Sequence, residues 1–190
     1  MALLFLALLP SLVWGQNDPQ FLVVTRLHFN PKSGATAEQW LAHQKEYFEK
    51  VTQKNDLILS SNVLVHYYTN DNSEVLFAFT VRKWEDVENS GTKDNELAKA
   101  AWPDEAKRKE FFAKSASFYT SEHSDEIRAI LPNTKVLKET TQQIYYIRTS
   151  RMAFPTDGKQ SEMAELMNEY NQNVTLKNSL LKGYYPSRHS

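Results

Sequence analysis

Six polar side chains on predicted strands are the first candidates for binding chemistry; they are Arg26, His28, His66, Tyr68, Arg151 and His189. In a strand, alternate residues share a face, so neighbouring candidates two positions apart point the same way. Buried cations are costly unless they are paired or line a hydrated cavity. Basic residues that recur on an inward face therefore predict a polar pocket for an anionic or oxygen-rich small molecule. The alternative is that these side chains face solvent at strand ends.

A separate candidate is His123, which stands beside Asp125 and Glu126 near the predicted end of a helix. A neutral imidazole near a carboxylate can titrate around neutral pH or bind haem iron, so His123 is a candidate general base or haem ligand. The alternative is a surface histidine that the dipole favours at a helix C-terminus. The sequence requires no cofactor and predicts no other metal ligand; haem is the cofactor that His123 would suit.

Several functional classes lack sequence support. The chain has no cysteine and five glycines, and it contains no G-x-S-x-G elbow, phosphate-binding glycine loop or H-E-x-x-H zinc helix. Its 22 basic and 23 acidic residues give a formal net charge of -1. This balance gives no electrostatic reason to expect nucleic acid or an anionic membrane as a partner.

The N-terminus predicts export. Residues 2–14 are almost wholly apolar and are followed by Gly15 and Gln16, which is typical of a signal peptide over residues 1–15. The run is shorter than the roughly 20 apolar residues that span a bilayer, and Pro10 interrupts it. We expect a periplasmic or secreted protein that is not in the membrane after signal removal. Because no basic residue follows Met1, the start of the signal peptide could lie upstream.

The remaining pattern predicts an α+β fold. Period-2 alternation and amphipathic periodicity indicate a strand at 21–29, a helix capped by Thr36 with Gln39, strands at 63–68 and 74–83, helical sequence over 84–131 with a break at Pro103, and a short strand at 134–138. This order is βαββαβ, the ferredoxin-like unit, over residues 20–139. Its antiparallel sheet carries helices on one face and leaves the other free.

Residues 144–190 repeat part of this unit, with a strand at 145–154, a helix at 161–173 and a strand at 180–188. At an offset of 123, the matches include Tyr47 with Tyr170, Val51 with Val174, Asn55 with Asn178, Leu57 with Leu180, and His66 with His189. A shift of two residues then matches Arg26 with Arg151. The alternative is chance similarity between two amphipathic helices. The second unit is partial, so a longer chain or another subunit would supply its missing strands.

Together with the phrases Trp84-Glu85-Asp86 and Glu122-His123-Ser124-Asp125-Glu126-Ile127, this organisation resembles the dimeric α/β-barrel superfamily, including exported proteins of uncharacterised function from Bacteroidetes-type bacteria. The resemblance implies that two free sheet faces join into one barrel, which a homo-oligomer would complete. It also implies a range of activities, so the fold does not select a function. We expect an exported small-molecule-binding barrel. The alternatives are a cofactor-independent or haem-using monooxygenase-like enzyme and a structural or interaction protein.

Overall fold

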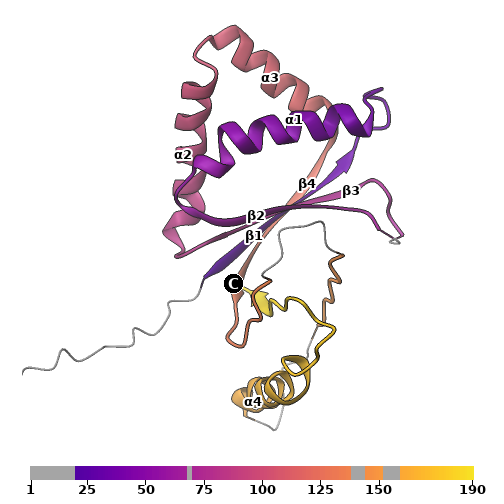
Figure 1. The fold of residues 1–190 in the computed structure, drawn as a ribbon, viewed down its shortest axis with the longest axis vertical. Coiled ribbons are helices and arrows are strands. Elements are labelled where there is room, and N and C mark those ends of the chain that lie inside the picture. The colour runs from indigo at the N-terminus through magenta and orange to yellow at the C-terminus, as the bar shows by residue number, and fades with distance from the viewer. Residues whose placement is uncertain (1–19, 68–69, 138–143, 152–158) are drawn as a thin grey trace, which may run out of the picture.

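A five-stranded antiparallel sheet organises the computed structural model, which describes residues 20–67, 70–137, 144–151 and 159–190 (Figure 1). The strands are β1 (Phe21–Phe29), β2 (Ile58–Val65), β3 (Glu74–Val81), β4 (Tyr119–Ile130) and β5 (Ser187–His189), in the order β2-β3-β1-β4-β5. The helices are α1 (Ala37–Lys50), α2 (Glu85–Ala101), α3 (Glu105–Ser117) and α4 (Gln160–Tyr170), with short turns η1 (Thr52–Lys54) and η2 (Asn171–Thr175). The elements β1 to β4 therefore form the predicted ferredoxin-like unit.

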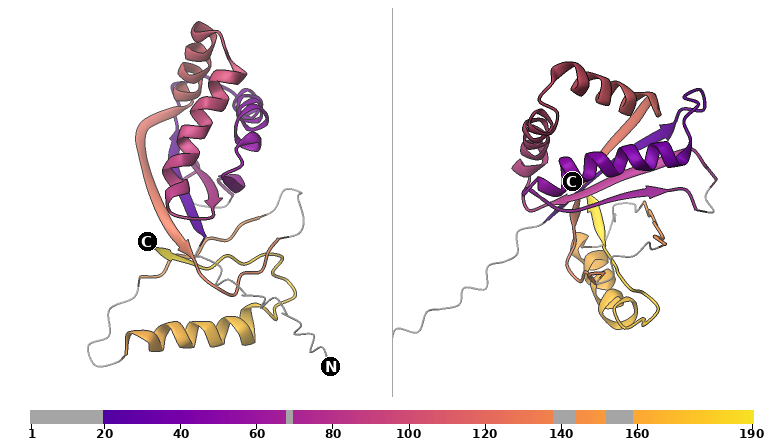
Figure 2. Two further views of the ribbon diagram at one scale, coloured as in Figure 1. Left: turned by 90° about the vertical axis from the view of Figure 1, so that its left-hand side faces the viewer. Right: turned by 45° about the horizontal axis from the view of Figure 1, so that its top comes forward.

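Helices α1, α2 and α3 cover one face of the sheet and not the other, and the residues of β1 show which face is which. Val23 is buried, and Phe29 packs edge-on against Trp40 of α1, so the odd-numbered residues of β1 face the helices. Arg26 and His28 lie on the opposite, helix-free face, as the alternation predicted. Figure 1 and the right-hand view of Figure 2 show α1, α2 and α3 together on one side of the sheet.

Two apolar clusters hold the helices in place; they are Val51, Ala98, Trp102 and Phe111, and Trp40, Val75 and Phe118. Helix α1 begins with the predicted capping box, because the Thr36 hydroxyl accepts from the Gln39 amide while the Gln39 side chain accepts from the Thr36 amide. Asp104 caps α3 in the same way, accepting from two backbone amides of the first turn.

The prediction of helix over residues 84–131 was wrong for its C-terminal part. Residues 119–130 form β4, which pairs with β1 from Phe21 opposite Ala129 to Phe29 opposite Tyr119. The hydrogen bonds of this long-range ladder override the weak strand propensity of a segment rich in serine and acidic residues. The helical part is confirmed in α2 and α3. Two strand predictions also shift, since β2 already begins at Ile58 and the strand expected at 134–138 is a single bridge between Lys135 and Tyr184.

The helix predicted at 161–173 is confirmed, and the strands predicted on either side of it are corrected. Helix α4 and η2 cover the predicted helical segment, but residues 145–151 are not a strand. Residues 180–186 also lie outside any strand, and β5 pairs with β4 of the first sheet. A strand needs a ladder partner, and residues 145–151 have none among the described residues. The division into two units stays a prediction. Figures 1 and 2 show α4 apart from the other three helices.

Two predictions concern the membrane. The predicted signal peptide lies outside the described residues. Among the residues that the structure does describe, no helix is both long and apolar enough to cross a bilayer.

Candidate functional site

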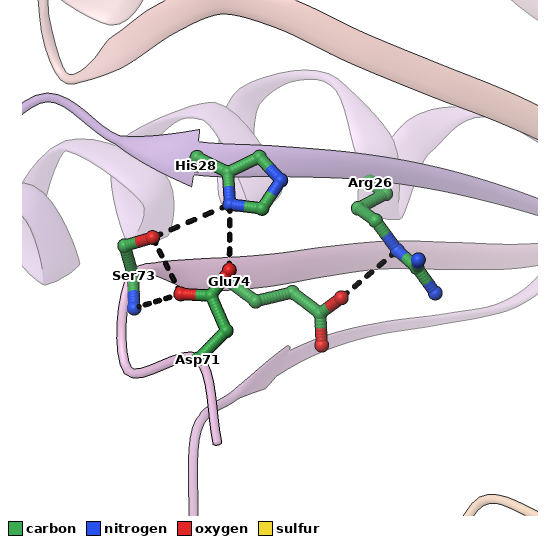
Figure 3. A network of polar contacts seen from close by, with 5 residues as sticks. All are labelled: Arg26, His28, Asp71, Ser73 and Glu74. Atoms are coloured by element: carbon green, nitrogen blue, oxygen red, sulfur yellow. Dashed lines mark hydrogen bonds and ion pairs between the residues drawn. The ribbon is translucent and has the colours of Figure 1, made fainter. Parts of the chain in front are cut away.

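A polar network surrounds His28 at the end of β1 (Figure 3). Nδ1 of His28 lies 3.1 Å from Oδ2 of Asp71 and 3.3 Å from Oγ of Ser73. Oδ1 of Asp71 accepts the backbone amide of Ser73 at 2.8 Å and the Ser73 hydroxyl at 2.6 Å. These contacts assign the Nδ1–H tautomer or the imidazolium to His28, because a carboxylate can only accept.

The strand register explains why these groups meet. His28 pairs with Glu74, the first residue of β3, so the loop before β3 lies beside the imidazole. The amide of Phe29 donates to the carbonyl of Ser73 at 2.8 Å, which ties this loop to β1. Within the loop, Asp71 closes a side-chain turn onto Ser73, a local motif that Asp favours. The carboxylate is therefore held in place by the backbone rather than by its contact with histidine alone.

The electrostatics favour an ionised Asp71. The two hydrogen bonds from Ser73 lower the pKa of this carboxyl, and the nearby His28 adds a smaller effect in the same direction. An ionised carboxylate on Nδ1 fixes the orientation of the ring. Nε2 has no hydrogen-bond partner among the described residues and can donate to a ligand or accept a proton from one.

Arg26 lies two residues from His28 on the same face, but it is already paired. Its Nε is 2.9 Å from Oε1 of Glu74, and its side chain is 54% exposed. Figure 3 shows Arg26 and His28 side by side along β1, with Glu74 between the strands. The pair leaves the terminal guanidinium nitrogens as donors while Glu74 reduces the local positive charge.

The network borders an open hollow of about 680 Å³. Its walls combine β1, the loop before β3 and the start of β4; the lining residues are His28, Phe29, Pro31, Asn72, Ser73, Thr120, Ser121 and Glu122. A smaller, mostly apolar hollow of about 280 Å³ adjoins it, shares Phe29 and Pro31, and reaches Trp40 and Phe118. The combined lining offers an imidazole, several hydroxyl groups, one carboxylate and a nearby apolar wall.

The other predicted strand residues do not join this site. His66 is half-buried just after β2, Tyr68 lies outside the described residues, and Arg151 is exposed in the segment that is not a strand. His189 is opposite Arg128, which itself pairs with Leu22. Leu22 lies six positions from His28 along β1, a distance of about 20 Å at the usual strand rise. Among the five candidates that the structure describes, only Arg26 and His28 are brought together, and their role in binding stays a prediction.

His123 is on a strand and not at a helix end, which corrects its predicted position. It lies in β4 opposite Leu27, with its Nε2 3.6 Å from Oδ2 of Asp125 and its side chain 58% exposed. The hydroxyl of Thr25 donates to Oδ1 of Asp125 at 2.6 Å. Because His123 lies in a strand, the alternative of a histidine favoured by the dipole at a helix C-terminus does not apply to it. It borders neither hollow, and the described residues contain no cluster of three or more metal-ligand side chains.

The sequence interpretation missed most of the lining. Asp71 and Ser73 lie between the strands predicted at 63–68 and 74–83, and residues 120–122 lie in the segment predicted to be helical. The spacing Asp71-Asn72-Ser73 directly before a strand is a local signal for an aspartate turn and could have identified the first pair. Nothing local marks residues 120–122, because their place depends on the pairing of β4 with β1.

Strand order and site together define a ferredoxin-like α+β protein with an open polar hollow on its sheet. No protein-family model matches the chain, and no curated protein matches it significantly. Similar solved structures include an antibiotic biosynthesis monooxygenase (12% identity, 59% of this chain, 99% of that one, TM-score 0.39). A nipsnap family protein of unknown function from Agrobacterium tumefaciens is 8% identical, and the match covers 59% of this chain and 88% of that one with a TM-score of 0.41. A dimeric ferredoxin-like protein of unknown function from Bacteroides fragilis is 8% identical, and the match covers 57% of this chain and 93% of that one with a TM-score of 0.36.

Proposed function

We propose that this chain binds an oxygen-rich small molecule in the hollow beside His28. The observation that carries the proposal is the imidazole whose Nδ1 is held by Asp71 and whose Nε2 has no hydrogen-bond partner among the residues that the structure describes. A ring oriented in this way has little rotamer freedom to lose on binding, which favours affinity. The surrounding hydroxyl groups add donors and acceptors at the same wall.

The lining favours a hydroxylated aromatic acid over a simple anion. His28 and the hydroxyl group of Thr120 can donate to a carboxylate, whereas Glu122 can accept from a ligand hydroxyl. The Ser73 hydroxyl already donates to Asp71, so it offers only an acceptor. Phe29 and the adjoining apolar hollow suit an aromatic ring. Because Glu74 already neutralises Arg26, we assign Arg26 to the polar edge of the site and not to a dedicated anion clamp.

Titration calorimetry with a panel of hydroxybenzoates tests the proposal, and an absorbance titration with haem tests the haem-using alternative. We expect saturable binding of at least one aromatic acid, weakened tenfold or more by His28→Ala, while Arg151→Ala leaves it unchanged. A tenfold loss corresponds to about 1.4 kcal/mol, the size of one hydrogen bond in such a site. Absence of binding across the panel at millimolar concentration, or binding that His28→Ala does not weaken, would refute the proposal.

The proposal includes export and self-association. The apolar run over residues 1–15 supports export of the mature chain to the periplasm or out of the cell. The hollow is open to solvent, so a second copy placed over it would enclose the ligand. Sedimentation velocity with and without the bound acid tests this step, and we expect the ligand to increase the dimer fraction.

A further inference from the structure

Helices α1 and α4 are each followed by the same asparagine turn, although the segment before it is a 3-10 turn (η1) after α1 and a π-helical turn (η2) after α4. The amide of Asn55 donates to the carbonyl of Thr52 at 3.2 Å, and the amide of Asn178 donates to the carbonyl of Thr175 at 3.2 Å. In both copies the asparagine Oδ1 accepts the amide two residues further on, at 3.1 Å in the first and 2.9 Å in the second. The sequence offset of 123 therefore has a structural counterpart in these two turns, and we use it to match the residues of the two helices.

In the first copy, α2 covers the face that these residues form. Val51 is fully buried in a cluster with Ala98 and Trp102. Nδ2 of Asn55 donates to Oδ1 of Asp94 at 2.6 Å and to the carbonyl of Ser90 at 2.9 Å, and the hydroxyl of Tyr47 lies 3.4 Å from Oδ2 of Asp94. The covering helix thus presents a small residue, an aspartate, a small residue and a tryptophan at intervals of four, namely Ser90, Asp94, Ala98 and Trp102.

In the second copy, the corresponding face is bare. Val174, the counterpart of Val51, is 49% exposed, and Tyr170, the counterpart of Tyr47, is 56% exposed. Met163 and Leu166 extend the same apolar face and are 48% and 61% exposed. Among the described residues, neither the Tyr170 hydroxyl nor Nδ2 of Asn178 has a hydrogen-bond partner. The face therefore keeps both the apolar contacts and the two donor groups that bind α2 in the first copy.

We propose that this face of α4, formed by Tyr170, Val174 and Asn178, docks a helix of the α2 type supplied by a partner polypeptide. The partner helix carries a carboxylate between two small residues at four-residue intervals, followed by an aromatic residue. The carboxylate accepts from Tyr170 and Asn178, and the small residues admit Val174 as Ala98 admits Val51. The aromatic residue covers the end of the valine side chain.

The number of helices among the described elements argues against a second copy of this chain as the partner that covers α4. Each chain has two faces of this kind, on α1 and on α4, but one α2. That helix is already held by Val51, Tyr47 and Asn55 of its own chain. Exchange of α2 between copies would cover one face only by uncovering another, so it brings no net burial.

A fluorescein-labelled peptide of residues 84–118, which contains α2 and α3, serves as the probe in an anisotropy titration with the full chain. We expect saturable one-to-one binding. Val174→Asp should weaken it at least tenfold, because a carboxylate would then enter an apolar contact. Tyr170→Phe and a peptide with Asp94→Asn should each weaken it several-fold. Glu165→Gln is the matched control, since Glu165 lies on the opposite side of α4 from Val174.

Three results would overturn the proposal. One is no saturable binding of the peptide at millimolar chain concentration. Another is binding that Val174→Asp leaves unchanged, because the peptide would then occupy the α1 face. The third is a dimer of the isolated chain, seen by light scattering, that Val174→Asp dissociates, because a second copy would then cover α4. None of these results depends on the hollow beside His28, so the small-molecule proposal is tested separately.

Discussion

The paired valines of the two copies allow a stability experiment with an internal control. Val51 is fully buried between α1, α2 and α3, whereas Val174 is 49% exposed on α4. Val51→Ala removes two methyl groups from the core, a transfer loss of about 1.6 kcal/mol at roughly 0.8 kcal/mol each. The cavity left behind raises the expected loss to about 2–3 kcal/mol, because the aromatic wall of Trp102 and Phe111 cannot collapse fully. Val174→Ala should change stability by no more than about 0.5 kcal/mol.

Urea unfolding followed by tryptophan fluorescence measures both changes, since Trp102 stacks at 4.1 Å on Phe111 in the affected cluster. For a chain of this length, a loss of 2–3 kcal/mol corresponds to a fall in Tm of about 4–12 °C. Equal destabilisation by Val51→Ala and Val174→Ala would refute the reasoning. That result would mean that the α4 face is already covered in the isolated chain, and it would remove the basis for the docking proposal as well.

Three further predictions concern the helix layer and the N-terminus. Burial, aided by the nearby Lys114, lowers the pKa of His43 from 6.5, so folding favours the neutral ring. The contribution of His43 to the unfolding free energy should be complete above pH 6.5 and should decrease as the pH falls below that value. His43→Gln should flatten this pH dependence in urea titrations. Thr36→Ala should cost about 1 kcal/mol by removing the cap of α1, measured in the same assay. If the chain is exported, N-terminal sequencing of the secreted product should begin at Gln16; a product that retains residues 1–15 would contradict the signal peptide.

The local part of the fold could be predicted and the long-range part could not. Residues 21–29 and the capping box at Thr36 have patterns that depend only on neighbours in sequence, and both are confirmed. Residues 119–130 have a composition that favours helix and turn. They form β4 because β1 offers ladder partners for residues 123–129 and, after a register shift, for Tyr119, and this information lies about 100 positions away in the sequence.

The candidate site likewise has a part that local sequence predicts and a part that depends on long-range pairing. Alternation along one strand was sufficient to place Arg26 and His28 on one face. The partner of His28, however, comes from the loop before β3, and its position depends on the β1–β3 register. For His66 and His189, the sequence predicted a similarity that the structure does not show. Their equivalence in the repeat predicted similar surroundings, yet they lie near β2 and in β5, at opposite edges of the sheet.

The repeat explains this error in physical terms. Asn55 and Asn178 make the same two local hydrogen bonds, so similar sequence has given similar backbone geometry. Asn55 is also 3% exposed, because α2 covers it, whereas Asn178 is exposed. Burial depends on which elements pack together, and in the second copy the described residues provide no helix equivalent to α2. The counterpart of a covered side chain is thus displayed at an open position, and this mismatch is the basis of the docking proposal at α4.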